Sequence, residues 1–458
     1  MLQQHYTILY EQSAVSSAKI QLYNHLLAPA GVTLSWIVYD ANTHSLHRDQ
    51  LVADAVLVNG SENADEINVE NLSLLKQGSR RLVAVFPTSL IEADSARLLV
   101  PFEWQGKLVQ KFLSRALPIS LQDLKFEIVT GNFDQHIELF TSGNSQILIA
   151  PLDDLILYDQ DFLGARKYMI LPLFECPPAL MQGVLALKNV TDERLKEHLR
   201  QIGEDTTSLQ KAIQLSAAYP ETQHGVIHLD LPWISFTFLN GFNIGGQSFD
   251  NWEMPEPPEA WEGKRFFAST EFMKDFFRYE YFSPADAGGS EATFVASHKA
   301  IHDAALESKL RLVKLWAAGT KTWFELAKKD LWVNGSADGI GMETLAEVWS
   351  FPGISISKQN LEILTNTESA TTWQEEGWNA FGTYELVPSF STNLKDELSH
   401  AEVVFWTSYQ QYKEGSQYVS ADVIHATPAG KTAQLLAGKH PFIFPSIRAF
   451  NWWWKRKK

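Results

Sequence analysis

Apolar residues recur along this chain in two alternating patterns. Short runs typical of strands appear in YTILYEQ (6–12), VTLSWIVYD (32–40), ADAVLVNG (53–60) and RLVAVFP (81–87). Between the first two lies SSAKIQLYNHLLAPAG (16–31), which has helical spacing and ends on Ala-Gly, as helices often do. Strands that alternate with helices predict an α/β protein built in layers.

The alternation continues through the next part of the chain. KFEIVT (125–130), SQILIAP (145–151) and ALMQGVLALK (179–188) predict strands, and QHIELFTSG (135–143) predicts a helix. A further helix is expected in TDERLKEHLRQI (191–202), with its Thr as the N-terminal cap.

Proline and glutamate then dominate the segment WEMPEPPEAWEG (252–263). We place the main domain boundary there and expect 221–262 to be a linker between residues 1–220 and 263–458.

A strand–loop–helix pattern occurs twice in the C-terminal part. ATFVASHKAIHDAA followed by KLWAAGTKTWFELAKK is matched by VVFWTSYQQYKEG followed by VIHATPAGKTAQLLAG. Ser297 and Gly319 are separated by 22 positions, and so are Ser408 and Gly430. This self-similarity predicts two equivalent supersecondary modules.

Composition restricts the partners of the protein. The 458 residues carry a net charge of −16, with 45% apolar and 20% charged residues, which predicts globular domains without a nucleic-acid partner. No apolar stretch reaches the roughly 18 residues of a membrane span. The N-terminus lacks the basic region of a signal peptide. We therefore expect no membrane contact and a cytoplasmic location.

No metal site is expected. The single Cys176 excludes an intrachain disulfide and a cysteine metal cluster. His298 and His302 have the i, i+4 spacing of a zinc pair, but no third ligand accompanies them.

Hydroxyl and glycine residues occupy matched positions in the two repeats. Ser297 and the pair Thr407–Ser408 stand where a strand gives way to a helix. Glycine-containing loops open the next helices, at Thr320 in the first repeat and at Gly430, Lys431 and Thr432 in the second. Free N–H groups at a helix start bind anions, although plain capping of structural helices explains the same residues. HATPAGKT is not a phosphate-binding P-loop, because His425 stands where that motif needs glycine.

Residues 263–458 resemble uroporphyrinogen-III synthase. The "T-S" strand end and "G-x-T-A" helix start of that family correspond to Thr407–Ser408 and to ATPAGKTAQLL. The resemblance implies two similar α/β domains, no cofactor, and closure of linear hydroxymethylbilane into a macrocycle with inversion of the last ring. Hydroxyls and backbone amides would bind the eight carboxylates of this substrate. The tyrosine that the family uses near the interdomain crossover has no clear counterpart, since Tyr384 comes earlier and Phe390 stands near the expected place.

Residues 120–190 resemble porphobilinogen deaminase, also called hydroxymethylbilane synthase. The "RGN-x-D" and "QGALAIE" motifs of that family correspond to Asn132, Asp134 and the Gln182–Gly183 pair. The resemblance implies that 1–220 forms two lobes like those of periplasmic binding proteins. Few catalytic residues of the deaminase family have a counterpart here. Glu62 falls close to the aspartate that the family has at a strand end, and Arg115 is the one arginine kept in the segment that replaces the family's anion-binding loop.

The cofactor-bearing third domain of the deaminase and its cysteine are missing after residue 220. We therefore expect no dipyrromethane and an inactive deaminase-like half.

The sequence thus predicts an α/β protein in which two periplasmic-binding-protein-like lobes precede a two-domain uroporphyrinogen-III synthase-like module. The predicted function is tetrapyrrole biosynthesis with hydroxymethylbilane as substrate, with other enzymes of the pathway as further partners. Two alternatives stay open: a bifunctional enzyme that starts from porphobilinogen, and a non-catalytic protein that binds tetrapyrrole intermediates.

Overall fold

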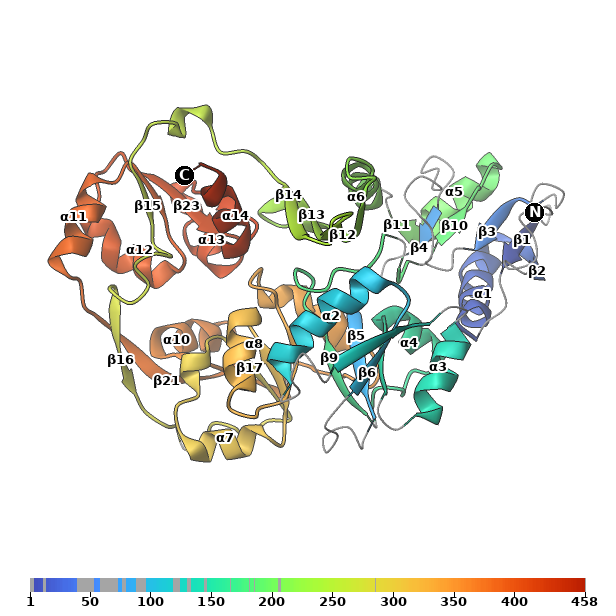
Figure 1. The fold of residues 1–458 in the computed structure, drawn as a ribbon, viewed down its shortest axis with the longest axis horizontal. Coiled ribbons are helices and arrows are strands. Elements are labelled where there is room, and N and C mark those ends of the chain that lie inside the picture. The colour runs from blue at the N-terminus through green and yellow to red at the C-terminus, as the bar shows by residue number, and fades with distance from the viewer. Residues whose placement is uncertain are drawn as a thin grey trace. The chain divides into compact units, whose positions relative to one another are not determined.

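The computed structural model describes residues 4–10, 14–38, 53–57, 73–75, 80–87, 96–117, 124–129, 133–143, 146–164, 166–180, 182–184, 186–204, 207–284 and 286–457. The chain divides into two compact units. Figure 1 labels the helices and strands of both. Unit 1 comprises 1–228, 237–251 and 351–355, and unit 2 comprises 229–236, 252–350 and 356–458.

The first sheet of unit 1 has six strands in the order β11-β4-β10-β3-β1-β2. Its strands are β1 (Gln4–Tyr10), β2 (Val32–Val38), β3 (Ala55–Leu57), β4 (Ser73–Leu75), β10 (Ala186–Lys188) and β11 (Gly203–Glu204). β1 pairs in parallel with β2 and β3, whereas β10 runs antiparallel to β3 and β4. Helices α1 (Ala14–Leu27) and α5 (Glu193–Ile202) supply Tyr23 and Leu195 to the buried cluster that contains Ile8 of β1.

The second sheet of unit 1 has the order β7-β6-β8-β5-β9. Its strands are β5 (Leu82–Phe86), β6 (Ala96–Val100), β7 (Leu124–Ile128), β8 (Gln146–Pro151) and β9 (Lys167–Ile170). It is accompanied by helices α2 (Glu103–Ala116), α3 (Phe133–Ser142) and α4 (Leu152–Tyr158). Every residue of β5 is buried, as expected for a central strand covered on both faces. The predicted α/β class is confirmed.

The segment 221–262, predicted to be a linker, instead carries a three-stranded sheet. Its strands are β12 (Thr222–Leu231), β13 (Ile234–Asn243) and β14 (Ser248–Glu253), preceded by helix α6 (Thr207–Ala217). β13 has one partly exposed position near its start and then a continuous buried run. Pairing with the neighbouring strands therefore decides that this segment is a sheet, although its composition is rich in turn residues. The proline-rich stretch after β14 is anchored by Trp261, whose ring meets Phe442 edge-on at 5.2 Å.

Two local predictions in unit 1 are wrong. Helix α5 is capped by Asp192 rather than by Thr191, because the Asp192 carboxylate accepts hydrogen bonds from the N–H groups of Arg194 (2.9 Å) and Leu195 (2.8 Å). The segment 179–188 is strand only in β10, since a turn closes between Ala179 and Gln182 and Gly183 has a φ of 73°.

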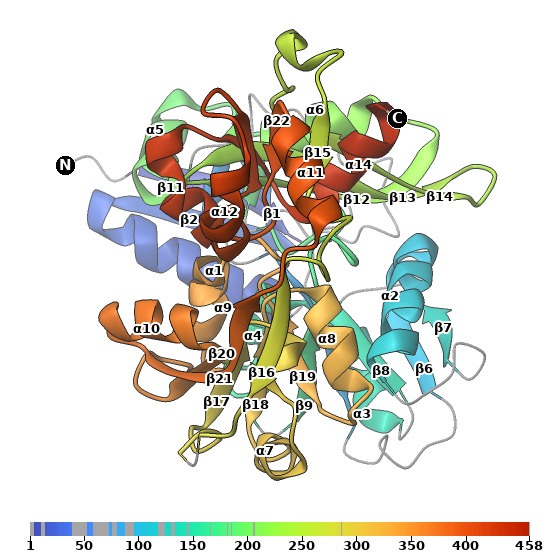
Figure 2. The same cartoon turned by 90° about the vertical axis from the view of Figure 1, so that its left-hand side faces the viewer.

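Unit 2 contains two sheets, seen in Figure 2, of which the smaller is entirely parallel and the larger is parallel except for its edge strand. The smaller has the order β15-β22-β23-β24, with β15 (Phe266–Ala268), β22 (Val403–Phe405), β23 (Ile424–Pro428) and β24 (Phe442–Phe444). It is accompanied by α11 (Thr392–His400), α12 (Tyr409–Gly415), α13 (Lys431–Leu435) and α14 (Ile447–Lys457).

The larger sheet of unit 2 has the order β16-β21-β20-β17-β18-β19. Its strands are β16 (Phe277–Tyr281), β17 (Ala292–Val295), β18 (Lys314–Ala317), β19 (Val333–Ser336), β20 (Leu361–Asn366) and β21 (Asn379–Pro388). Its helices are α7 (Ala304–Leu310), α8 (Thr320–Ala327), α9 (Ala346–Ser350) and α10 (Thr367–Glu375). The chain enters this sheet through β16 and leaves it through β21, which pair antiparallel. One sequence repeat therefore lies in each sheet, as β17–β18 and as β22–β23.

No helix in the described ranges is both long and apolar enough to cross a membrane.

Candidate functional site

A cavity of about 310 Å³ lies within unit 2, at the carboxyl ends of parallel strands from both of its sheets. The larger sheet contributes Ala296 after β17, Ala318 after β18 and Thr365 at the end of β20. The smaller sheet contributes Thr407 after β22 and the turn that follows β23. Ligands of open α/β sheets bind at this edge, where loops and helix starts converge.

The wall from the smaller sheet is formed by a threonine and a glycine turn. The Thr407 N–H donates to Ser269 Oγ at 2.9 Å, and the Thr407 hydroxyl bonds to Gln411 Oε1, so this side chain is fixed. Gly430 has a φ of 94°, which lets the chain turn sharply from β23 into α13. Lys431 and Thr432 open α13 and line the cavity.

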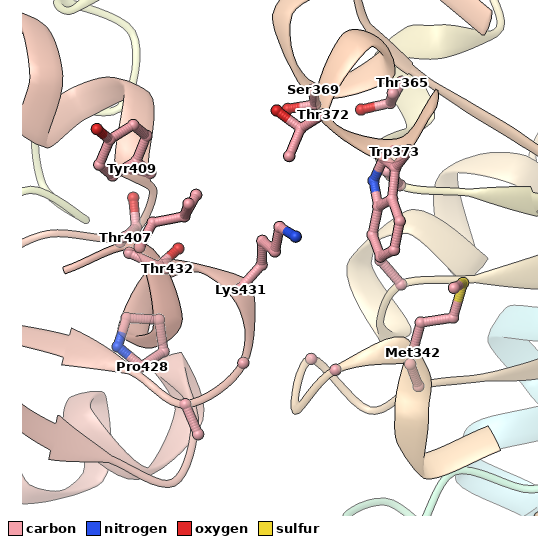
Figure 3. Close-up of a pocket in the computed structure, with 18 of the residues that line it drawn as sticks. Met342, Thr365, Ser369, Thr372, Trp373, Thr407, Tyr409, Pro428, Lys431 and Thr432 are labelled. Atoms are coloured by element: carbon pink, nitrogen blue, oxygen red, sulfur yellow. The ribbon is translucent and has the colours of Figure 1, made fainter. Parts of the chain in front are cut away.

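The opposite wall is the start of α10. Asn366 caps this helix by accepting from the Ser369 N–H at 3.0 Å, while its Nδ2 donates to Ser369 Oγ at 3.0 Å. Gln410, from the smaller sheet's α12, also donates to Ser369 Oγ at 3.0 Å. Ser369 therefore lines the cavity from the capped first turn of α10 and Thr372 from its second turn, and Figure 3 shows them facing Thr407 and Tyr409.

Charge in the cavity is balanced by pairing across it. Of the described residues that line it, Lys431 is the only lysine or arginine. Its ammonium forms an ion pair with Glu376 and lies 5.1 Å from the ring centroid of Trp373. A second pair joins Lys413 of α12 to Glu368 of α10 at 3.1 Å.

The predicted substrate-binding residues separate into two groups. Those lining the cavity are Thr407, Gly430, Lys431 and Thr432, and those outside its lining are Ser297, Thr320 and Ser408. Ser297 accepts from the Lys299 N–H and Ser408 from the Gln411 N–H, at 3.4 and 3.3 Å. These two serines act as helix caps in the structure, and Thr320 is the first residue of α8.

Neither candidate for the tyrosine of the uroporphyrinogen-III synthase family lies at the cavity. Tyr384 lies in β21 with 4% of its surface exposed, and burial raises the pKa of its hydroxyl to about 12 even though Ser297 and Asn366 hydrogen-bond to it. Phe390 packs against Phe276 with ring centroids 5.3 Å apart. Neither lines the cavity, whereas Tyr409 does.

Sequence reasoning missed the α10 wall and Tyr409. The residues that went unrecognised are Thr365, Glu368, Ser369, Thr372, Trp373, Tyr409 and Gln410. Asn366 followed by Glu368 is an N-terminal helix signature that marks the wall, and Tyr409 stands directly after the Thr407–Ser408 motif.

The candidate deaminase cleft in unit 1 is only partly described. Glu62 and Asn132 lie outside the described residues. Arg115 is in the last turn of α2, and Asp134 is in the first turn of α3. Gln182 is 5% exposed and accepts hydrogen bonds from Gln105 Nε2 (2.8 Å) and from the Ala179 N–H (3.1 Å), which is a structural role.

The cofactor of the deaminase family does not fit the residues of unit 1. Its dipyrromethane is attached through a cysteine, and the chain's single cysteine, Cys176, is 1% exposed. Reactive thiols lie in partly exposed surroundings, so a buried Cys176 offers no anchor.

Comparisons with known proteins leave the family of the chain open. No family model matches the sequence, and no curated protein does. The solved structures similar to it include a probable amino-acid ABC transporter extracellular-binding protein from Bacillus subtilis, with 13% identity, a TM-score of 0.27, and coverage of 46% of this chain and 92% of that one. The L-cystine solute receptor of Neisseria gonorrhoeae is 10% identical, with a TM-score of 0.28 and coverage of 44% and 86%. An arginine transport periplasmic binding protein from Legionella pneumophila is 8% identical, with a TM-score of 0.27 and coverage of 43% and 92%. Likeness at this level carries no argument about what the chain binds.

Proposed function

We propose that the protein is a uroporphyrinogen-III synthase whose substrate, hydroxymethylbilane, binds in the unit 2 cavity. The observation that carries the proposal is the convergence of two strand-end motifs on one cavity. Thr407 and Thr432, matched to the family motifs by position, line it together with the start of α10. The proposal extends to a role in tetrapyrrole biosynthesis, in the cytoplasm, beside other enzymes of that pathway.

The chemistry of the walls suits a polycarboxylate. Threonine and serine hydroxyls and the free N–H groups of a helix start donate hydrogen bonds to carboxylates, and such bonds to charged groups are stronger than neutral ones. An acidic chain with one lining lysine relies on these neutral donors. This agrees with the way the resemblance implies substrate binding.

The reaction also requires stabilisation of a cation. Loss of hydroxide from the linear substrate leaves an azafulvene cation. Glu343 lines the same cavity and supplies a carboxylate near this cation, whereas the charge of Glu368 is already paired with Lys413. Tyr409 is the lining residue whose hydroxyl can donate a proton to the departing oxygen.

The test supplies hydroxymethylbilane from a separate deaminase and resolves the isomers of the oxidised product. We expect an excess of isomer III over the isomer I that forms spontaneously. Replacing Thr407 and Thr432 together by valine removes the hydroxyl that holds Gln411 in the wall and one hydrogen bond to a charged group, which contributes about 1.5–3 kcal/mol, and should lower kcat/KM at least about 10-fold.

Thr371→Val is the matched control. Thr371 lies on exposed α10 surface and donates to the Thr367 carbonyl at 3.2 Å, away from the cavity lining. It should keep wild-type activity. If the double variant forms isomer III at the wild-type rate and has an unchanged melting temperature, the assignment of the site is refuted.

A non-catalytic tetrapyrrole-binding role is the second candidate. It is favoured by the ion pairing of Lys431 with Glu376 and by the burial of Tyr384. Tight binding of hydroxymethylbilane with isomer I formed only at the spontaneous rate would establish that role and exclude the synthase.

A further inference from the structure

The two walls of the unit 2 cavity are joined by three polar contacts that all end on α10 or directly after it. Lys431 pairs with Glu376, Lys413 pairs with Glu368, and Gln410 donates to Ser369. The partners on one side belong to α12 and α13, which accompany the smaller sheet, and those on the other side accompany the larger sheet. The start and the end of α10 are thus both tied across the cavity.

The ion pair with Glu376 occupies the ammonium group of Lys431, which is the group that an anionic ligand would bind most strongly. Lys431 extends from the turn after β23 toward Trp373, as Figure 3 shows. Glu376 neutralises it, and the Trp373 ring provides a face over which the ammonium rests at 5.1 Å. As long as Glu376 holds this ammonium, the described lining offers a ligand no free cation.

The pair is well placed to exchange. The side chain of Lys431 is 28% exposed and that of Glu376 is 41% exposed, so water competes for both charges. Solvent-exposed ion pairs are weak and easily replaced, whereas a buried pair would be costly to open. A carboxylate that enters the cavity can take the place of Glu376 while the lysine keeps its contact with Trp373.

We propose that Glu376 is a built-in competitor for Lys431, which a carboxylate of the substrate displaces on binding. Glu376 thereby sets the affinity and the selectivity of the cavity for polycarboxylates. A ligand with few carboxylates gains too little from its contact with Lys431 to displace Glu376. A ligand with carboxylates around its whole rim displaces Glu376 because it also reaches the hydroxyls of Thr432 and Ser369. This inference rests on the proposed function for the class of ligand, an octacarboxylate tetrapyrrole.

Equilibrium binding of uroporphyrin to the full-length protein, followed by the porphyrin's fluorescence, tests the inference. Removing the competitor with Glu376→Gln should tighten binding by about two- to five-fold, the effect expected of an exposed ion pair. Glu375→Gln is the matched control, since it removes the same charge one position earlier on the exposed end of α10 without touching the lysine contact. It should change binding by less than the first variant does.

A double-mutant cycle separates contact from general electrostatics. In a Lys431→Gln background, Glu376→Gln should have no further effect on uroporphyrin binding. Equal effects of Glu376→Gln and Glu375→Gln, weaker binding by Glu376→Gln, or no binding of uroporphyrin by any variant would overturn the proposal. Because binding requires no turnover, tighter binding without isomer III formation would refute the synthase and leave the competitor role standing. If the protein forms isomer III but Glu376→Gln binds uroporphyrin as the wild type does, the synthase proposal stands and the competitor role is refuted.

Discussion

At the scale of single residues, His224 is a neutral histidine held between two hydroxyls. Its Nε2 lies 2.7 Å from Ser216 Oγ and its Nδ1 lies 2.7 Å from Thr222 Oγ1, and Thr222 donates its own proton to the Tyr219 carbonyl. Burial lowers the pKa of His224 to about 4. Between the ordinary pKa of about 6.5 and the folded value, His224 takes up a proton in the unfolded chain but not in the folded one. Its contribution to the free energy of unfolding is therefore fully present above pH 6.5 and is lost as the pH falls toward 4.

His224→Gln should remove this dependence. The stability advantage of the wild type over the variant at pH 7 is expected to shrink by about 3 kcal/mol between pH 6.5 and 4. Thermal unfolding followed at half-unit pH steps measures it, and comparison with the variant cancels the contributions of other histidines. Parallel pH profiles for the two proteins would show that another group causes the acid sensitivity.

Residue spacing in the sequence located one wall of the cavity and missed the other. Thr407 and Thr432 belong to one repeat, so a local motif was enough to place them together. Ser369 and Trp373 belong to α10, which the repeats do not contain, and they reach the cavity only because the two sheets of unit 2 bring α10 opposite α12. Contacts between sheets are decided by packing of whole elements, which spacing within a motif does not encode.

At the scale of elements, Ser408 is the N-terminal cap of α12, and its loss should cost stability rather than binding. Ser408→Ala leaves the Gln411 N–H without its acceptor and should lower the free energy of unfolding by about 1 kcal/mol. Ser408→Gly should recover most of that loss, since glycine caps cost only a few tenths of a kcal/mol relative to serine. Chemical denaturation measures both. Uroporphyrin affinity that falls more than about ten-fold in Ser408→Ala, equivalent to roughly 1.4 kcal/mol of binding energy, would return this serine to the substrate-binding set.

Element prediction succeeded where apolar periodicity was strong and failed where pairing decided the outcome. β1, α1 and β5 match the expected segments within a few residues, because apolar residues of β1 and α1 form one core and β5 is buried throughout. The sheet β12-β13-β14 was taken for a linker because its turns are glycine-rich and its neighbours proline-rich. A close approach inside this sheet explains the glycine within β13, since a Cβ on Gly241 would lie 2.1 Å from the Gln223 carbonyl oxygen.

At the scale of the whole molecule, the α/β class followed from the alternation of strands and helices, but the sheet topology did not. Unit 2 builds its smaller sheet from β15 and from strands more than a hundred residues later, with the larger sheet inserted between them. Nothing in the local pattern of β15 identifies β22 as its partner. Phe266 pairs with Val403, and the antiparallel strands β16 and β21 carry the chain out to the larger sheet and back to the smaller one.

The whole chain should carry no covalently bound pyrrole, which separates the synthase proposal from a bifunctional enzyme. Cys176 is the single cysteine and is 1% exposed, so a thioether to dipyrromethane has no accessible anchor. Intact mass spectrometry of the protein expressed in cells that make porphobilinogen should give the mass of the polypeptide alone, and the purified protein should not consume porphobilinogen. An authentic deaminase purified in parallel serves as the positive control. A dipyrromethane adduct that disappears in Cys176→Ser would show that unit 1 is an active deaminase, and the protein would then convert porphobilinogen directly to the macrocycle.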